Sequence, residues 1–416
     1  MVSRIADRLG AARGLLFPRD FRLFVLGQSI SQVGDQCYLL ALAWLVAQRS
    51  GSAATLGLVL SAAAVPRALL MPFGGALADR LSHRRLLRFV NLALAALLLA
   101  LVGLAGAGTA PLWTIALVAV LVGGLEGLLT PAAYSMTPLL VPGKVLAQAN
   151  ALFLGSMLVC GIVGPLAGGW LLQNAGAALA FAIDSASFFA VAGLLTLMRP
   201  MPQAPRARAT LLDDIRPVAA SIRADRELAL YVALMLLGNL ALAGPLDVGF
   251  VAMAQGPLHG GPELLGTAMA LFAGGSLLGT LLGGVIGRPA RRVAKLFGGI
   301  LASGLLLALM SLATTTPLFM AIAALLGAGI GLIDVLAQTS IQQRAAPDQL
   351  GRVLGATLCA GKLLAPLSTA LAGLIADRSV PLLFAAAGGL WVATTLLLAL
   401  VARRAVQASA GTAVVG

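Results

Sequence analysis

The chain has 416 residues, of which 60% are hydrophobic and only 10% are charged, and its formal net charge is +13. An average soluble protein is about 25% charged, so this composition excludes a water-soluble globular protein and indicates a chain that crosses a membrane many times. The three cysteines, Cys37, Cys160 and Cys359, lie in apolar stretches without metal-ligand spacing, and we interpret them as packing residues.

The hydropathy pattern predicts twelve membrane-spanning helices, because roughly 20 apolar residues cross a bilayer as a helix. Three uncharged runs of 37 to 39 residues each hold two spans around a short turn: 89–125 with a turn at 106–111, 145–183 with a turn at 173–177, and 296–333 with a turn at 314–317. Two further uncharged stretches each hold one span: 264–287 and 379–402. Four spans carry internal charges: 21–47, 53–78, 228–254 and 353–376. The predicted fold class is therefore an all-α polytopic membrane protein.

The basic residues predict how the chain faces the membrane. All but four of the 28 lysines and arginines lie in alternate loops and in the two tails; the exceptions are Arg49, Arg67, Lys362 and Arg378. Cytoplasmic loops carry such an excess of positive charge, so we expect both termini in the cytoplasm. Membrane topology thus explains the positive charge, and no nucleic-acid partner is expected. The first apolar stretch is too long for the core of a cleaved signal peptide.

A polar segment near the middle divides the chain into two similar parts. We predict an N-terminal half at 1–198, a cytoplasmic linker at 199–227 and a C-terminal half at 228–416, with six spans in each half. A shift of about half the length places Gly74 on Gly283, Gly164-Pro165 on Ala365-Pro366, and Pro142 on Pro347. Internal repeats of this kind are typical of secondary transporters, whose substrate site lies between the repeats near the bilayer midplane.

The segment from Gly75 to Arg85, with Asp79, Arg80 and Arg84, resembles the loop 2-3 signature of the major facilitator superfamily. A degenerate copy without the acid surrounds Arg288, where that family repeats the motif. The segments 21–35 and 347–353 resemble bacterial exporters of the macrolide-efflux and enterobactin-export type. The resemblance implies the major facilitator fold with two pseudo-symmetric halves, and a gating role for the loop 2-3 residues.

Span 5 contains Gly164, Pro165, Gly168 and Gly169, similar to the second half of a glycine-proline motif found in proton-coupled antiporters. The upstream part does not match, because Cys160 occupies one glycine position and Gly161 is a residue out of register. Glycines at this spacing also let another helix approach closely, and proline bends a helix. Both a gating role and ordinary close packing remain open.

Five acids lie inside predicted spans, where an ionisable group costs at least about 2.5 to 3.5 kcal/mol and needs a cavity or a partner. The repeat relates Asp35 to Asp247 (247 − 35 = 212) and Glu126 to Asp334 (334 − 126 = 208). The resemblance implies that Glu126 and Asp334 pair with the loop arginines as a gate, with proton transport as the alternative. Asp35, in span 1, is our candidate proton carrier, or else forms a structural hydrogen bond. For Asp184 and Asp247, a wetted rim position and a transport role remain open.

Two bases also lie inside spans. Arg67 is at nearly the same depth as Glu126, which predicts an ion pair between them. Lys362 has no charged counterpart in span 5, and it either balances Asp334 or contacts an anionic group of the cargo. His83 and His259 are far from any His or Cys partner in the sequence, so no metal site is predicted.

The phosphate-binding pattern GxxxxGK followed by Ser or Thr is absent, so we expect no ATP-driven pump, no enzyme and no cofactor. The predicted function is export of a lipophilic small molecule, a drug or secondary metabolite, by proton antiport across a bacterial inner membrane. Export of a siderophore or another anionic metabolite, nutrient symport and lysolipid flipping remain alternatives. The expected partners are the cargo, protons and membrane lipid, with the chain as a monomer.

Overall fold

The computed structural model describes residues 17–106, 111–199, 226–286, 292–344 and 362–412, and within these ranges the regular structure is entirely helical. The N-terminal part holds these helices: α2 (Arg19–Ser50), α3 (Ala53–Leu81), α4 (His83–Gly106), α5 (Leu112–Tyr134), α6 (Thr137–Leu140), η1 (Gly143–Val145) and α7 (Leu146–Leu197). The C-terminal part holds these: α9 (Arg226–Gly244), η2 (Pro245–Gly249), α10 (Phe250–Gln255), α11 (Pro262–Ile286), α12 (Arg292–Leu309), η3 (Met310–Leu312), α13 (Thr316–Arg344), α15 (Ala365–Arg378) and α16 (Val380–Thr412).

Ten helical segments of the described ranges are long and apolar enough to cross a membrane, which makes the chain a multi-pass membrane protein. Twelve spans were predicted, and two observations account for the difference. Helix α7 carries two predicted spans in one assignment, because only Gly176 leaves the helical conformation at their junction (φ 79°, ψ 173°). Part of the span predicted at 353–376 lies outside the described residues, and α15 gives only its second part.

Local sequence explains several boundaries. Helix α2 ends at Gly51, whose left-handed conformation (φ 63°) suits glycine, and Ser52 starts α3 by accepting a hydrogen bond from the Thr55 backbone N–H. The span predicted at 228–254 is interrupted by the π-helical turn η2, which begins at Pro245 and contains Asp247. Proline lacks the backbone N–H of an ordinary helical turn, which explains why the wider turn starts there.

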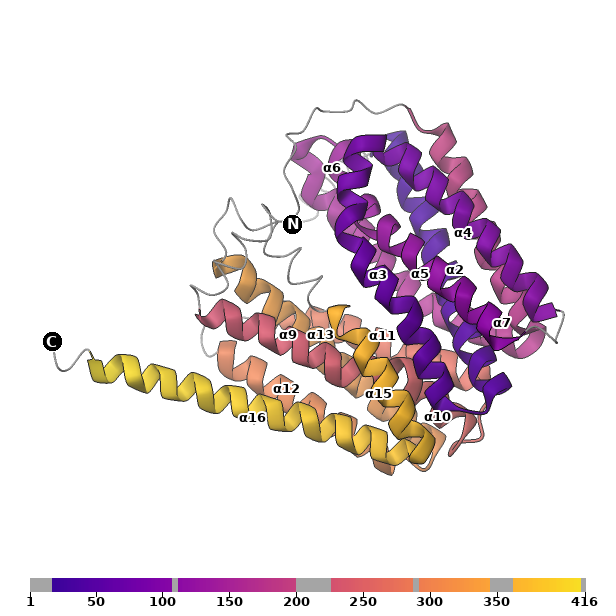
Figure 1. Cartoon of the computed structure of the whole chain (residues 1–416). Coiled ribbons are helices and arrows are strands. Elements are labelled where there is room, and N and C mark those ends of the chain that lie inside the picture. The colour runs from indigo at the N-terminus through magenta and orange to yellow at the C-terminus, as the bar shows by residue number, and fades with distance from the viewer. Residues whose placement is uncertain (1–16, 107–110, 200–225, 287–291, 345–361, 413–416) are drawn as a thin grey trace, which may run out of the picture.

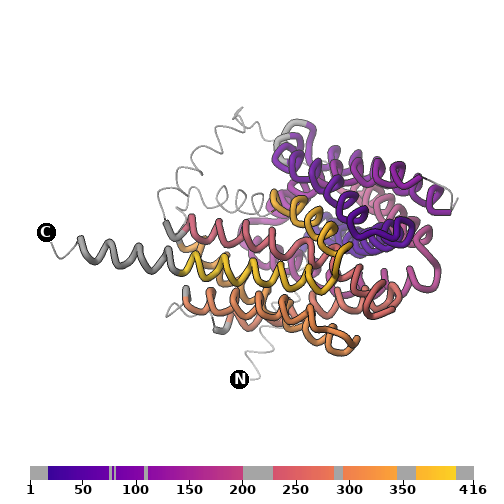
Figure 2. The backbone as a smooth tube through the Cα atoms, turned by 60° about the horizontal axis from the view of Figure 1, so that its bottom comes forward, coloured from indigo at the N-terminus to yellow at the C-terminus, as the bar shows by residue number. Residues whose placement is uncertain are grey.

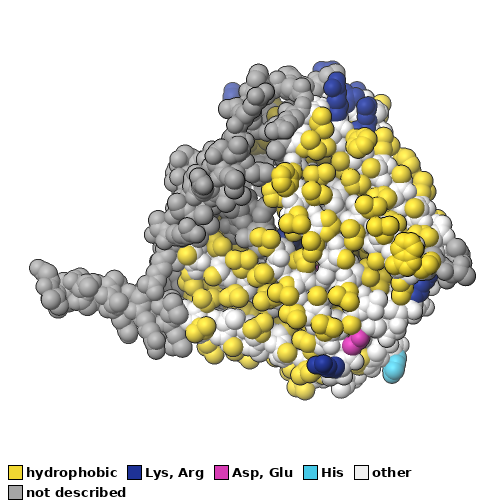
Figure 3. Space-filling view, in the orientation of Figure 1, with side chains coloured by type: hydrophobic (Ala, Val, Ile, Leu, Met, Phe, Trp, Pro, Cys, Tyr) yellow, Lys and Arg dark blue, Asp and Glu magenta, His cyan; other side chains and the backbone are white. Residues whose placement is uncertain are grey.

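The helices form two bundles. Figure 1 shows α2 to α7 gathered on one side and α9 to α16 on the other, and Figure 2 shows the same separation in a second view. One end of the molecule holds Ser52, Gly176, Gly261 and Ser379, and we call it the Ser52 end. The opposite end holds His83, Arg84 and Lys144, and we call it the Arg84 end. Hydrophobic side chains cover the band between these ends, while charged groups lie toward its edges (Figure 3). This band is the surface that lipid would cover.

The two bundles touch at the Ser52 end through two contacts built on glycines. Between α3 and α15, a Cβ placed on Gly57 would overlap the carbonyl oxygen of Thr369 and the backbone of Gly373. Between α11 and α7, a Cβ on Gly266 would overlap the carbonyl oxygen of Pro165 and the backbone of Gly169. Only glycine allows backbones to come this close, so both contacts depend on residues without a side chain.

The two glycine contacts match residue for residue. Gly373 faces Ala53, Ala54 and Gly57, whereas Gly169 faces Pro262, Glu263 and Gly266. The shift in residue number is 209 from Gly57 to Gly266 (266 − 57) and 204 from Gly169 to Gly373 (373 − 169). In these contacts Pro165 occupies the position that corresponds to Thr369. The sequence repeat had instead matched Pro165 with Pro366, three residues earlier.

Candidate functional site

The carboxyl group of Asp184 is buried where α2 meets the second segment of α7. Asp184 is 1% exposed, and its Oδ1 accepts a hydrogen bond of 3.1 Å from the Ser187 hydroxyl. Gly34 is the close neighbour that makes room, because a Cβ at this position would overlap Asp184 and Ser187. A wetted rim position, one of two alternatives for Asp184, is therefore wrong: the acid is buried because the small residue opposite it lets the helices pack tightly.

Asp35 follows Gly34 in α2 and is the charged group that acts most strongly on Asp184. Its Oδ1, like Oδ2 of Asp184, is buried and finds no hydrogen-bond partner among the described residues. The structural hydrogen bond considered for Asp35 is thus not present at this oxygen. A buried carboxylate oxygen without a hydrogen-bond partner is costly when it is charged, which makes these two acids a candidate site for a proton or a cation.

Arg67 of α3 and Glu126 of α5 form an ion pair of 3.0 Å between Nη1 and Oε2, which confirms the predicted pairing. The Arg67 side chain is 54% exposed and that of Glu126 is 14% exposed, so solvent screens the pair in part. Asp35 lies within electrostatic range of both. Glu126 is engaged by Arg67 in this structure, and its contact with the loop arginines stays a prediction.

The C-terminal bundle carries a second group of charges. Lys362 acts electrostatically on both Asp247 and Asp334, and Arg67 of the other bundle also acts on Asp247. No ion pair joins Lys362 to Asp334, both of which are described. They border a cavity of about 270 Å³ between α9, α12, α13 and α16, which is mostly apolar and also lined by Asn239, Gln338 and Trp391. A cavity with few polar groups in an apolar lining is typical of small-molecule sites.

The loop 2-3 motif lies at the Arg84 end. Gly75, Asp79 and Arg80 belong to the last turns of α3, but their side chains are outside the described part of the structure. Arg84 donates a hydrogen bond of 2.8 Å to the carbonyl oxygen of Thr196 at the end of α7. The backbone N–H of Arg85 approaches the Ser82 hydroxyl at 3.4 Å. The arginine thus holds α4 to α7, and a gating role of this motif stays a prediction.

The glycine-proline stretch of α7 packs against two different helices. Gly164 and Gly168 face Gln36 and Cys37 of α2, whereas Gly169 faces α11. No other atom lies within 4 Å of a Cβ placed on Gly161, which agrees with its position out of register. Close packing, one of the two readings of this stretch, is therefore confirmed; part of that packing is the contact between the bundles.

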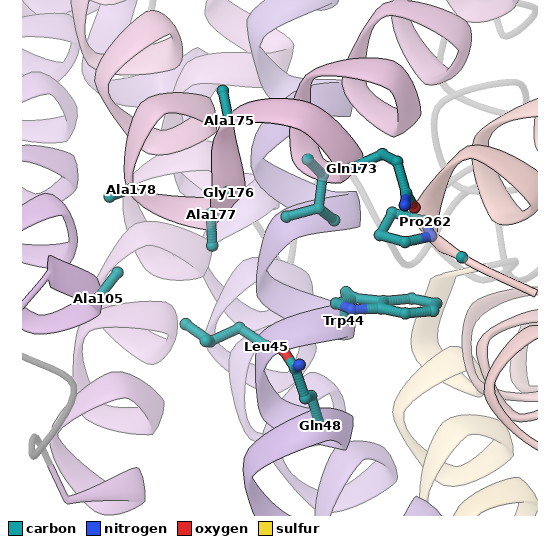
Figure 4. A pocket seen from close by; sticks show the side chains of 12 residues that line it. Trp44, Leu45, Gln48, Ala105, Gln173, Ala175, Gly176, Ala177, Ala178 and Pro262 are labelled. Carbon is teal, nitrogen blue, oxygen red and sulfur yellow. The ribbon is translucent and has the colours of Figure 1, made fainter.

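A further pocket of about 530 Å³ opens at the Ser52 end, beside the contact of α7 with α11. Figure 4 shows Trp44, Gln173 and Pro262 on one side of it and Ala105 and Ala178 on the other. Gln255 of α10 donates a hydrogen bond of 3.3 Å to the Trp44 carbonyl oxygen. Sequence reasoning missed this pocket, because its lining combines uncharged residues from four distant segments and no motif marks them.

Comparisons with known proteins cover most of the chain. The family model described as Major Facilitator Superfamily matches residues 24–369. Macrolide efflux protein A of Streptococcus pyogenes is 24% identical over 356 residues, or 85% of this chain and 88% of that protein. Multidrug efflux pump Tap of Mycobacterium tuberculosis is 26% identical over 365 residues, covering 86% and 87%. The structure of an auto-inhibited peptide transporter of the POT family superposes with a TM-score of 0.74 at 14% identity, over 93% of this chain and 97% of that chain.

Proposed function

Since the chain belongs to the major facilitator superfamily, a family of transporters, we propose that it exports a lipophilic small molecule in exchange for protons. The names of the curated relatives support export, because they are efflux proteins for macrolides and for multiple drugs. The observation that carries the exchange is that Asp35, half-buried in α2, and Asp184, buried in α7, each have a buried carboxylate oxygen without a hydrogen-bond partner.

The interior charges do not balance, and this favours protons and cationic cargo as the exchanged species. The predicted spans hold five acids, Asp35, Glu126, Asp184, Asp247 and Asp334, against two bases, Arg67 and Lys362, an excess of three (5 − 2). Glu126 already has Arg67. Uncompensated charges at bilayer depth cost free energy, so protons neutralise these acids when no cargo is bound. A cation that displaces them completes an exchange.

The matched glycine contacts support two pseudo-symmetric six-helix halves, 1–198 and 228–416, joined by the linker 199–227. In this proposal the Arg84 end and both termini face the cytoplasm, as the distribution of basic residues predicts. The bundles then touch at the outer end of the membrane. A cargo would enter from the cytoplasmic side and leave when the bundles rock apart at the Ser52 end.

The cavity beside Lys362 supports a second candidate, an exporter of an anionic metabolite such as a siderophore. Lys362 has no ion pair with Asp334 and is exposed at this cavity. An anionic group could therefore bind the ammonium group of Lys362 while the apolar walls hold the rest of the molecule. Lys362→Met would abolish export of an anionic cargo and spare export of cationic dyes.

Accumulation of cationic dyes and macrolides tests the main proposal, in a bacterium that lacks its principal efflux pumps. The wild-type chain should lower accumulation, and a protonophore should abolish this effect. Asp35→Asn should remove it at an equal amount of protein in the membrane, whereas Asp20→Asn, in the first turn of the same helix, should not. Unchanged accumulation of every compound, with the protein present, would refute export of dyes and macrolides and leave the anionic cargo to be tested.

A further inference from the structure

An acidic residue of one bundle caps a helix of the other at the Ser52 end. Asp377, in the last turn of α15, accepts hydrogen bonds from the Ala53 backbone N–H (2.5 Å to Oδ1) and the Ser52 hydroxyl (2.8 Å to Oδ2). Ser52 in turn accepts a hydrogen bond of 3.1 Å from the Thr55 backbone N–H. The first turn of α3 is thus satisfied partly by its own Ser52 and partly by a carboxylate from the opposite bundle.

The physical basis of this contact is specific to an acid. The first N–H groups of a helix have no partner within the helix, and its N-terminus carries a partial positive charge. A carboxylate that accepts from these groups forms charge-assisted hydrogen bonds. Sequence motifs gave no hint of this role, because the two partners are 324 residues apart.

The matching contact on the other side of the molecule lacks this acid. The shifts that superpose the glycine contacts also place Gln173 on Asp377 (377 − 173 = 204) and Gly261 on Ser52 (261 − 52 = 209). The Gln173 side chain does approach Gly261. However, Gln173 is uncharged, Gly261 has no hydroxyl, and Pro262, at the position of Ala53, has no N–H to donate. One contact is therefore capped by charge and the other is not.

We propose that Asp377 is the residue that keeps the Ser52 end closed, and that the uncharged contact at Gln173 is the weaker one. The proposal builds on the rocking motion proposed above, and it names a positioning residue that does not touch the cargo. The bundles part when α3 and α15 lose the cap. The α7–α11 side yields more easily, into the pocket lined by Trp44 and Gln173.

The cap is the outermost layer of a longer contact. One turn further in, Gly57 packs on Gly373, and beyond it the Ser61 hydroxyl lies 2.7 Å from that of Thr369 and 2.5 Å from the Pro366 carbonyl oxygen. Ser61 is 8% exposed. A thiol at this position is reached by water-soluble reagent from the Ser52 end only when α3 and α15 separate, so it reports directly on opening.

The test measures how fast a membrane-impermeant thiol reagent labels Ser61→Cys in intact cells, in a chain whose three native cysteines are serines. Asp377→Ala should raise the labelling rate about fivefold, the usual effect of removing a helix cap. Asp377→Asn keeps one acceptor oxygen but loses the charge and the second acceptor, so it should raise the rate less than Asp377→Ala does and more than Gln173→Ala does. Gln173→Ala should raise the rate less than Asp377→Ala does. Glu263→Ala removes an exposed acid from the first turn of α11 but keeps the Cα that faces Gly169, so it is the matched control and should leave the rate unchanged.

Equal labelling of Asp377→Ala and the parent would overturn the proposal, as would an equal rise with Glu263→Ala. If Asp377→Ala reaches the membrane poorly, the labelling rates of Gln173→Ala and Asp377→Asn are compared with that of the parent instead. A larger increase with Gln173→Ala than with Asp377→Asn would refute the asymmetry. The labelling needs no cargo. Failure of the export proposal would appear as unchanged dye accumulation in the parent, and the two failures are therefore distinguishable.

Discussion

Replacing Gly169 by alanine should push the two bundles apart at the Ser52 end. The added Cβ would lie 2.8 Å from the Pro262 carbonyl oxygen and 3.0 Å from Cα of Gly266. Ordinary contact begins at 3.4 Å, so α7 and α11 must separate by about 0.6 Å (3.4 − 2.8), and both partners are backbone atoms that cannot rotate away. Overpacking of this kind costs about 1 to 3 kcal/mol.

The cost falls only on the state in which α7 touches α11, so it shifts the equilibrium toward the state opened at the Ser52 end. A difference of about 1 to 3 kcal/mol corresponds to a roughly 5- to 150-fold change in the ratio of the two states. The gain in helix propensity from glycine to alanine applies to both states and cancels.

The assay is labelling of Ala270→Cys by a membrane-impermeant reagent in intact cells, in a chain without native cysteines. Ala270 is 4% exposed and follows Gly266 by one helical turn on the same face of α11. Gly161→Ala, on the same helix α7 with no other atom within 4 Å of the added Cβ, is the matched control. Gly169→Ala should label several times faster than Gly161→Ala. Equal rates in the two variants would refute the reasoning.

Two further substitutions test the interior. Glu126→Gln should lower the stability of the purified protein by about 1 kcal/mol, because it leaves Arg67 without its partner at a half-exposed site; the double variant with Arg67→Gln should recover part of this loss in a thermal unfolding assay, and no recovery would show that the pair does not couple. Gly34→Ala should destabilise the fold by about 1 to 3 kcal/mol, because the methyl group would overlap Asp184 and Ser187. Gly103→Ala, in open surroundings on α4, should leave the melting temperature near that of the parent, and a similar drop in both variants would argue against tight packing at Gly34.

Hydropathy predicted the helices well because the bilayer imposes their length. The span predicted at 21–47 became α2, Arg19–Ser50, and the turn predicted at 106–111 separates α4 from α5. The π-helical turn at Pro245–Gly249 was not predicted, since hydropathy does not distinguish one kind of helical turn from another. At Gly176 a turn of five residues was predicted, whereas a single residue reverses the chain. Hydropathy does not show how many residues a turn between two helices needs.

The candidate site shows where sequence reasoning stops. Equal depth in spans 2 and 4 was enough to predict the pair of Arg67 with Glu126, because depth follows from the helical rise per residue. Depth alone did not exclude a wetted rim for Asp184, since burial depends on the face of the helix and on Gly34 of another helix. The contact of Asp377 with Ser52 joins residues far apart in the sequence, and only the folded chain brings them together.

A single non-helical residue, Gly176, joins the two segments of α7. A flexible loop would absorb a small displacement of one helix, but a single residue passes it on to the next. The first segment carries Gly169 at the contact with α11, and the second carries Asp184 eight residues beyond Gly176, about 12 Å along the helix. We therefore expect a displacement at the contact with α11 to pass on to the segment that holds Asp184, and an insertion of flexible residues at Gly176 to uncouple the two segments.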